Sequence, residues 1–112
     1  MTCHRWDIVF LPAHEKDKEG HPAVVLSADD IMEDDRQLRF NAIVGTKKQP
    51  AENADSHHVI LDGADGLAFT TLVDCSLVYV AKKTSIMRSG GNVTVHRRQQ
   101  IQRAVRACLG LG

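Results

Sequence analysis

His21 is the residue whose position most strongly indicates chemistry, because it stands between Gly20 and Pro22, directly before a short apolar run. A histidine transfers protons near neutral pH, and a following proline restricts the residue before it to extended backbone conformations. The apolar run Ala23–Leu26 suits a buried strand that would anchor the imidazole. The pattern indicates a proton-transfer group held at the edge of a strand; an exposed turn residue is the alternative.

Other polar residues could assist such a group. Thr46 closes an apolar segment and offers a hydrogen-bond donor, and the adjacent Lys47 and Lys48 could hold phosphates as point charges. Asp74 lies in an apolar stretch, where a carboxylate usually has a partner; it could orient an imidazole or, if protonated, act as an acid. His14 lies in a charged loop. Each has a plainer alternative, since Thr46 can simply end a strand, Asp74 can be structural and His14 can be solvated.

Neither a metal site nor a disulfide framework is expected. His57 and His58 are adjacent, so a strand would send their rings to opposite faces. Cys3, Cys75 and Cys108 are an odd number at wide spacing, which matches neither a disulfide framework nor a zinc pattern. We expect unreactive thiols, with Cys108 in the core, and a reduced, cytoplasmic protein.

The composition is that of an ordinary globular protein, with 43% hydrophobic and 25% charged residues in 112. We therefore expect one domain spanning residues 1–112. No apolar run approaches the roughly 20 residues of a membrane span, and no signal peptide is expected. The charge is uneven: residues 1–35 hold three basic and nine acidic residues, and the rest hold 11 basic and five acidic. The second part could form a basic face for a polyanion, or the charges could intermix on the folded surface.

The elements that must position these residues are short strands. Alternating and β-branched segments bounded by turn residues predict strands over 5–12, 22–27, 38–46, 58–61 and, as one long strand or two with a bend, 68–81. The acidic segment 28–37 reads as a connection with a helical turn. Polar loops are expected at 13–21 and 47–57, and turns at 62–66 and 89–92.

The last segment is different, because its apolar residues have helical spacing. Thr94 is a good N-cap and Gly110 suits the residue after the helix. Between them, one apolar face is formed by Ile101, Ala104, Val105, Cys108 and Leu109. Short strands followed by one amphipathic helix predict a mainly β fold, a small and strongly bent sheet or barrel closed by a C-terminal helix.

Four segments, in this order, resemble the PemK/MazF toxin family. "RWDIV" is similar to the family's opening Arg-Gly-Asp-Ile-Val, and "GHPAVVLS" to its Gly-x-Arg-Pro-Ala-Val-Val-Leu-Ser second strand. "IVGTKKQP" resembles its third strand, which ends in Thr or Ser before a Lys-rich loop. "TLVDCS", the terminal helix and "LGL" resemble its Val-x-x-Asp-Gln stretch, helix and Leu-Gly-Leu ending. Together the segments cover nearly the whole chain.

The resemblance implies an SH3-like small barrel with a C-terminal helix, and a homodimer. It also implies an endoribonuclease toxin that cuts single-stranded RNA at short motifs, independently of the ribosome. The product would carry a 2′,3′-cyclic phosphate, and neither metal nor cofactor would be needed. An antitoxin protein would neutralise the enzyme, and no membrane is involved.

The resemblance also implies site residues. The family's Arg before the second-strand Pro is replaced here by His21, and Thr46 matches the Thr or Ser that ends the third strand. His14 with Glu15 loosely matches a His-Glu pair, and Asp74 matches the Asp of the Val-x-x-Asp stretch. We expect RNA contacts from four residues, namely Lys47, Lys48, Glu15 and Arg5. The helix arginines form a solvated face or contact RNA or antitoxin.

Two other functions fit the same resemblance. The first is a non-catalytic member that binds RNA or a partner protein, since the usual Arg is absent. The second is a gyrase-poisoning relative on the same barrel. Fold alone does not separate these from a nuclease, because function depends on the site.

Overall fold

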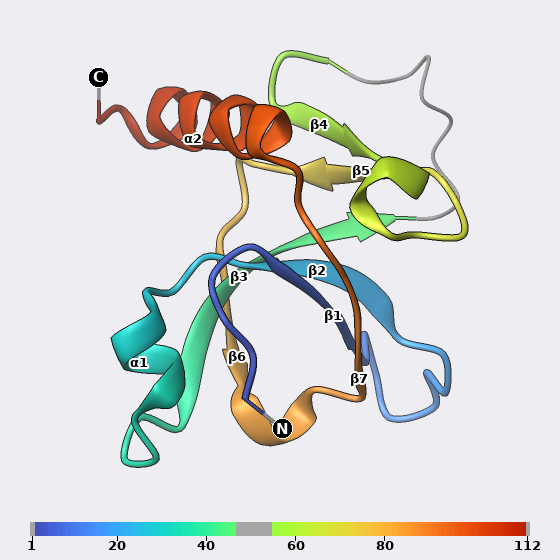
Figure 1. The fold of residues 1–112 in the computed structure, drawn as a ribbon, viewed down its shortest axis with the longest axis vertical. Coiled ribbons are helices and arrows are strands. Elements are labelled where there is room, and N and C mark those ends of the chain that lie inside the picture. The colour runs from blue at the N-terminus through green and yellow to red at the C-terminus, as the bar shows by residue number, and fades with distance from the viewer. Residues whose placement is uncertain (1, 47–54, 112) are drawn as a thin grey trace.

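The computed structural model describes residues 2–46 and 55–111. In this part of the chain, seven antiparallel strands form one bent sheet, and a C-terminal helix lies across one end of it (Figure 1). The strands are β1 (Asp7–Leu11), β2 (His21–Val25), β3 (Arg39–Thr46), β4 (His58–Leu61), β5 (Thr71–Asp74), β6 (Tyr79–Lys82) and β7 (Arg88–Asn92). Their order is β4-β5-β3-β2-β1-β7, with β6 also paired to β3. The predicted fold, mainly β with a C-terminal helix, is confirmed.

Both faces of β1 and β2 are buried, which explains why these two strands are apolar at nearly every position. One core contains Ile8, Phe10 and Val24 together with side chains of β3, β4, β5 and the helix. The other contains Val9, Leu11 and Ala23 together with residues around the first helix. Alternation along β1 and β2 sends successive side chains to the two cores in turn. His21 therefore shares a face with Ala23.

β3 is the central strand and changes partner along its length. Its first half pairs with β6, and its last two residues pair with β5. Gly45 permits this change, because a Cβ there would lie 2.6 Å from Oγ1 of Thr71. That hydroxyl donates a 2.8 Å hydrogen bond to the carbonyl oxygen of Thr46. The close approach fixes the end of β3, where Thr46 lies.

The acidic connection forms the helical turn that the sequence predicts, as α1 (Asp29–Glu33). The ammonium group of Lys83 closes its C-terminal end. It donates hydrogen bonds of 2.6 Å to the carbonyl of Ile31, 3.2 Å to that of Met32 and 2.9 Å to that of Asp34. A cation at a helix C-terminus satisfies carbonyls that have no partner within the helix.

Segment 68–81 forms two strands, β5 and β6, separated by a turn after Asp74. The prediction of a turn at 89–92 is wrong, because these residues belong to β7. Its glycines serve close packing instead. A Cβ on Gly90 would lie 2.2 Å from the Phe10 ring, and one on Gly91 would lie 2.2 Å from the Asp65 carbonyl oxygen.

α2 (Val95–Leu109) begins and ends as predicted, with Thr94 at the N-cap position and Gly110 in the left-handed conformation, φ 69°. Its apolar stripe is only half covered: Ile101 is fully buried, whereas Leu109 is 51% exposed. The expectation that Cys108 lies in the core is wrong, because it is exposed on the last turn of the helix. None of the described helices has the length and apolarity to cross a membrane.

Candidate active site

His21 is paired with an acidic side chain that precedes it by four residues. Nδ1 of His21 lies 2.9 Å from Oδ2 of Asp17. The His21 side chain is 41% exposed, whereas that of Asp17 is only 11% exposed. His21 is the first residue of β2 and lies opposite Leu11, the last residue of β1. The imidazole is thus held at the loop end of the β1–β2 hairpin.

The loop between β1 and β2 is folded around the Asp17 carboxylate. Oδ2 accepts a 2.9 Å hydrogen bond from the Ala13 N–H, and Oδ1 accepts one of 2.9 Å from the Gly20 N–H. Gly20 adopts φ +77°, and a Cβ there would lie 2.8 Å from Sδ of Met87. Glycine tolerates both the conformation and the contact.

These contacts set the protonation state of the Asp17 carboxylate. The Ala13 N–H, with the Gly20 N–H and the imidazole, holds the pKa of Asp17 far below its usual range, against a smaller opposing effect of burial. The carboxylate is therefore ionised and can only accept hydrogen bonds. Nδ1 of His21 must carry the shared proton, so the lone pair of the neutral ring is on Nε2. His21 is thereby oriented as a proton acceptor.

An open groove of about 400 Å³ lies beside His21. Leu11, His21 and Val44 line one side, and the β6 residues Tyr79 and Val80 line the other. Tyr79 and Val80 are 49% and 68% exposed, respectively. The groove thus combines one proton acceptor with an exposed aromatic ring and apolar walls.

Thr46 lies at the same end of the sheet as His21. The pairing of β2 with β3 ends at Ala23 and Val44, two residues short of His21 and Thr46 respectively. Side chains two residues apart along a strand share a face. The β2–β3 register therefore puts Thr46 and His21 at the same end of neighbouring strands, although Thr46 does not line the groove beside His21.

Asp74 is not part of this arrangement. It lies at the far end of β5, opposite His58, whereas Thr46 is opposite Leu72. Burial raises the pKa of Asp74, but the hydroxyl and N–H of Ser76 and the nearby histidines outweigh it, so the pKa is lowered. The ionised carboxylate does not suit the role of proton donor that the sequence suggested, and the imidazole beside it is not His21.

The remaining predicted residues lie apart from the groove or outside the described residues. His14 and Glu15 are exposed, and Nδ1 of His14 accepts a 3.2 Å hydrogen bond from the Lys16 N–H. The Arg5 guanidinium donates to the carbonyl of Leu26, beyond the opposite end of β2, at 2.9 Å. This places Arg5 outside the His21 groove. Lys47 and Lys48 lie outside the described residues.

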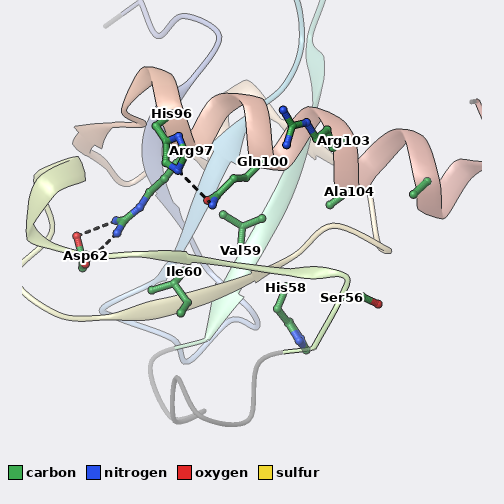
Figure 2. A pocket seen from close by; sticks show the side chains of 11 residues that line it. Ser56, His58, Val59, Ile60, Asp62, His96, Arg97, Gln100, Arg103 and Ala104 are labelled. Carbon is green, nitrogen blue, oxygen red and sulfur yellow. Dashed lines mark hydrogen bonds and ion pairs between the residues drawn. The ribbon is translucent and has the colours of Figure 1, made fainter.

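A second hollow, of about 780 Å³, lies between α2 and β4 (Figure 2). One of the two arginines that line it is already engaged, because Arg97 makes a bidentate ion pair with Asp62, at 2.7 and 3.1 Å, and also bonds Asp65. Asp65 is 1% exposed. Figure 2 shows Val59 directed toward α2 and the His58 ring on the other side of β4. This hollow is held by structural ion pairs.

The sequence pattern was not interpreted as placing Asp17 in the site, although a spacing that indicates this role is present. An Asp followed three residues later by Gly and four residues later by His can close a turn through its side chain and also reach the imidazole. The loop holds other carboxylates, Glu15 and Glu19. Only the folded loop shows which of them contacts His21.

The sequence of residues 4–109 matches the family described as PemK-like, MazF-like toxin of type II toxin-antitoxin system. The chain belongs to this PemK/MazF family. A search of curated proteins gives no match.

Solved structures share the fold of this PemK/MazF member at low sequence identity. An endoribonuclease in complex with its cognate antitoxin, from Mycobacterial species, is 16% identical with a TM-score of 0.75, covering 99% of this chain and 96% of that one. A MazE-MazF crystal structure from Deinococcus radiodurans is 14% identical with a TM-score of 0.77, covering both chains completely at 100%. The Mycobacterium tuberculosis toxin MazF-mt6 is 13% identical with a TM-score of 0.76, covering 95% of this chain and 98% of that one. The small barrel is therefore that of MazF toxins.

Proposed function

We propose that this PemK/MazF protein is an endoribonuclease toxin that cleaves single-stranded RNA, with His21 as the proton acceptor. The observation that carries the proposal is the 2.9 Å contact of His21 with Asp17 at the edge of an open groove. Family membership and the presence of an endoribonuclease among the similar structures support the same reaction.

The chemistry uses the RNA's own 2′-hydroxyl as nucleophile. Nε2 of His21 removes the hydroxyl proton, O2′ forms a bond to phosphorus, and the bond from phosphorus to O5′ breaks. The products are a 2′,3′-cyclic phosphate and a 5′-hydroxyl, and solvent water supplies the proton to the leaving O5′. In this proposal, Thr46 donates a hydrogen bond to a phosphoryl oxygen. Lys47 and Lys48, which follow it in sequence, would neutralise neighbouring phosphates.

The reaction needs neither metal nor cofactor, since the imidazole supplies the base. The groove favours unpaired bases, because an exposed Tyr79 ring offers a stacking surface that a duplex cannot reach. As a toxin of a type II system, the protein would act on cytoplasmic RNA as a homodimer and be neutralised by an antitoxin protein. The antitoxin complexes among the similar structures support that partner.

The direct test is cleavage of a long single-stranded RNA by the purified protein in EDTA, with the cut ends mapped. We expect cuts at a short repeated motif that leave 2′,3′-cyclic phosphate ends. His21→Ala should lose about 10²- to 10⁴-fold in rate, the usual effect of removing a general base. His21→Arg restores the family's usual residue and should cleave. A parent-like rate for folded His21→Ala would refute the role of His21.

One observation favours a second function. His21 stands where the family has Arg, so the charge that a guanidinium would place on the transition state is missing. A member that binds RNA without cutting it would follow. Such a protein would bind the same RNA, leave it intact in EDTA, and gain cleavage only as His21→Arg.

A further inference from the structure

A cluster of metal-ligating groups lies away from the His21 groove, at the start of β4. Oδ1 of Asp55 is 2.8 Å from Nδ1 of His57 and 3.1 Å from Nδ1 of His58. The ligand atoms of the three residues all lie within 4.8 Å of one another. The His58 side chain is 10% exposed, and those of His57 and Asp55 are 37% and 54% exposed. In this cluster the His58 side chain is nearly buried, and the side formed by His57 and Asp55 is open to solvent.

The two rings converge because His57 lies outside the strand. The turn that precedes β4 is closed by a 3.1 Å hydrogen bond from the His58 N–H to the Asp55 carbonyl. The His57 N–H also donates to Oδ1 of Asp55 at 3.2 Å. Strand alternation does not apply across this turn, and the ring centroids are 4.6 Å apart. The expectation that the rings point to opposite faces is therefore wrong.

Nδ1 of His58 accepts a 3.3 Å hydrogen bond from the Asp55 backbone N–H, and the same nitrogen lies 3.1 Å from Oδ1 of Asp55. A nitrogen lone pair and a carboxylate oxygen attract each other only through a proton or a cation between them. A cation bound by the ring lone pairs and the carboxylate would bridge these atoms and would displace the hydrogen bond from the Asp55 N–H.

We propose that Asp55, His57 and His58 form a binding site for a divalent transition-metal ion of the Zn²⁺ type. Imidazole nitrogens with a carboxylate suit Zn²⁺ better than Mg²⁺ or Ca²⁺, which prefer oxygen ligands. Two ligand atoms at Zn²⁺ bonding distance and tetrahedral angle lie about 3.3 Å apart. The observed separations of 2.8 and 3.1 Å need only a slight opening of the cluster. Water would complete the coordination on the open side.

The neighbouring strand adds a second carboxylate to this face. Asp74 lies directly opposite His58 in the β4–β5 register, and directly opposed residues project from the same face of a sheet. Its Oδ1 is held by the Ser76 N–H and hydroxyl at 2.9 and 2.5 Å. The fixed negative charge favours a cation without requiring Asp74 to be a ligand. Asp74 thus has a role beside this cluster, whereas it has none in the His21 groove.

The test is titration of the full-length, tag-free protein with ZnCl₂ by isothermal calorimetry, with Co²⁺ absorption as a second measurement. We expect one saturable ion per chain. His57→Gln and Asp55→Asn should weaken binding by at least tenfold, since loss of a second-shell partner alone costs about 10- to 100-fold. The matched control is His96→Gln, which changes an exposed histidine of α2 outside the cluster and should bind like the parent.

Folding of each variant is checked by circular dichroism, and Asp55→Asn serves if His57→Gln fails to fold. The proposal is overturned if the parent shows no saturable site, or if both cluster variants bind Zn²⁺ as tightly as the parent. The proposed RNA cleavage is independent of this site. A nuclease active in EDTA can lack the metal site, and a metal-binding protein can lack nuclease activity.

Discussion

Nδ1 of His21, the first residue of β2, lies 2.9 Å from Oδ2 of Asp17, which belongs to the loop between β1 and β2. The strand fixes the position of the ring, and the carboxylate fixes its tautomer. A histidine with both constraints is oriented before any substrate arrives, which lowers the cost of reaching the transition state.

The first prediction concerns Asp17→Asn. A side-chain amide can either donate to or accept from the ring, so the tautomer with its lone pair on Nε2 is no longer enforced. The cleavage rate at saturating RNA should fall, by less than the roughly 10²- to 10⁴-fold expected of His21→Ala, while RNA affinity stays the same. Single-turnover kinetics with separate binding measurements distinguish the two effects.

The matched control for Asp17→Asn is Asp35→Asn. It removes one exposed carboxylate from the acidic connection and should cleave like the parent. A parent-like rate in Asp17→Asn would show that the pairing with His21 serves only the loop conformation.

A second prediction concerns Asp74→Asn. The carboxylate lies opposite His58 and is bonded to Ser76, so it cannot orient His21. Cleavage of single-stranded RNA should therefore remain within about twofold of the parent, whereas Thr46→Ala, which removes one hydrogen-bond donor, should lose activity. Initial rates under identical salt conditions check this. A large loss in Asp74→Asn would return that residue to the catalytic site.

Most strands were predictable because apolar alternation and turn residues do not depend on distant contacts. The misread element, β7, contains two glycines that look like a turn. They are required by neighbours that no local pattern reveals, the Phe10 ring for Gly90 and the Asp65 carbonyl for Gly91. Close approach between distant segments and a tight turn select the same residue type.

The candidate site was predictable in part. His21 and Thr46 could be placed at the same end of two neighbouring strands, because adjacent antiparallel strands fix their register. Asp74 could not, because only the β4–β5 register shows which end of this strand meets His58. Asp17 needed the loop conformation, which depends on backbone hydrogen bonds from Ala13 and Gly20.

A third prediction concerns the ion pair that attaches α2 to the turn after β4. Asp65 is 1% exposed and accepts hydrogen bonds from the Thr94 N–H at 3.0 Å and from Arg97. Arg97→Met leaves this carboxylate buried without its cation, which costs about 3–5 kcal/mol. Arg103→Met changes an exposed arginine of the same helix and should cost little. Urea unfolding at neutral pH measures both.

The difference in unfolding free energy between the parent and Arg97→Met should change with pH in a defined direction. Hydrogen bonds from Arg97 lower the pKa of Asp62 below its ordinary value of 3.8. A carboxylate whose pKa is lower in the folded than in the unfolded protein stabilises the fold at pH values above its unfolded-state pKa. This stabilisation is lost as the pH falls through the pKa of the folded state. The stability gap between parent and Arg97→Met should therefore narrow below about pH 4. A gap that widens in acid would contradict this assignment.

A fourth prediction concerns Trp6, which has φ +75° where the resembling family motif has Gly. Its N–H donates to the Val25 carbonyl and its own carbonyl accepts from Val93, at 2.8 and 2.9 Å, so the backbone cannot relax. Trp6→Ala and Trp6→Gly both remove the ring, but only Gly removes the strain, about 1–2 kcal/mol. The Gly variant should be the more stable of the two by thermal unfolding. The reverse order, usual in unstrained backbone, would show that the conformation costs nothing.

The last prediction concerns the uncovered end of α2. Its apolar stripe continues past the monomer core, leaving Leu109 and Leu111 51% and 69% exposed. The segment between β5 and β6 passes beneath this helix (Figure 1) and exposes Leu77 by 50%. The two elements meet here, because Cys75 of this segment belongs to the core cluster against which Ala104 and Val105 of α2 pack. A symmetric dimer that uses this face would cover the exposed leucines.

Light scattering at micromolar concentration should give the mass of a dimer for the parent and of a monomer for Leu109→Asp, since a charge in the centre of an apolar interface is left unpaired. Leu38→Asp is the control: that side chain is 70% exposed, beside β3 rather than α2, and its dimer should persist. A monomeric parent would refute the dimer itself. A dimer that survives Leu109→Asp but not Leu38→Asp would place the interface near the start of β3, because the charge disrupts only the surface that the partner covers.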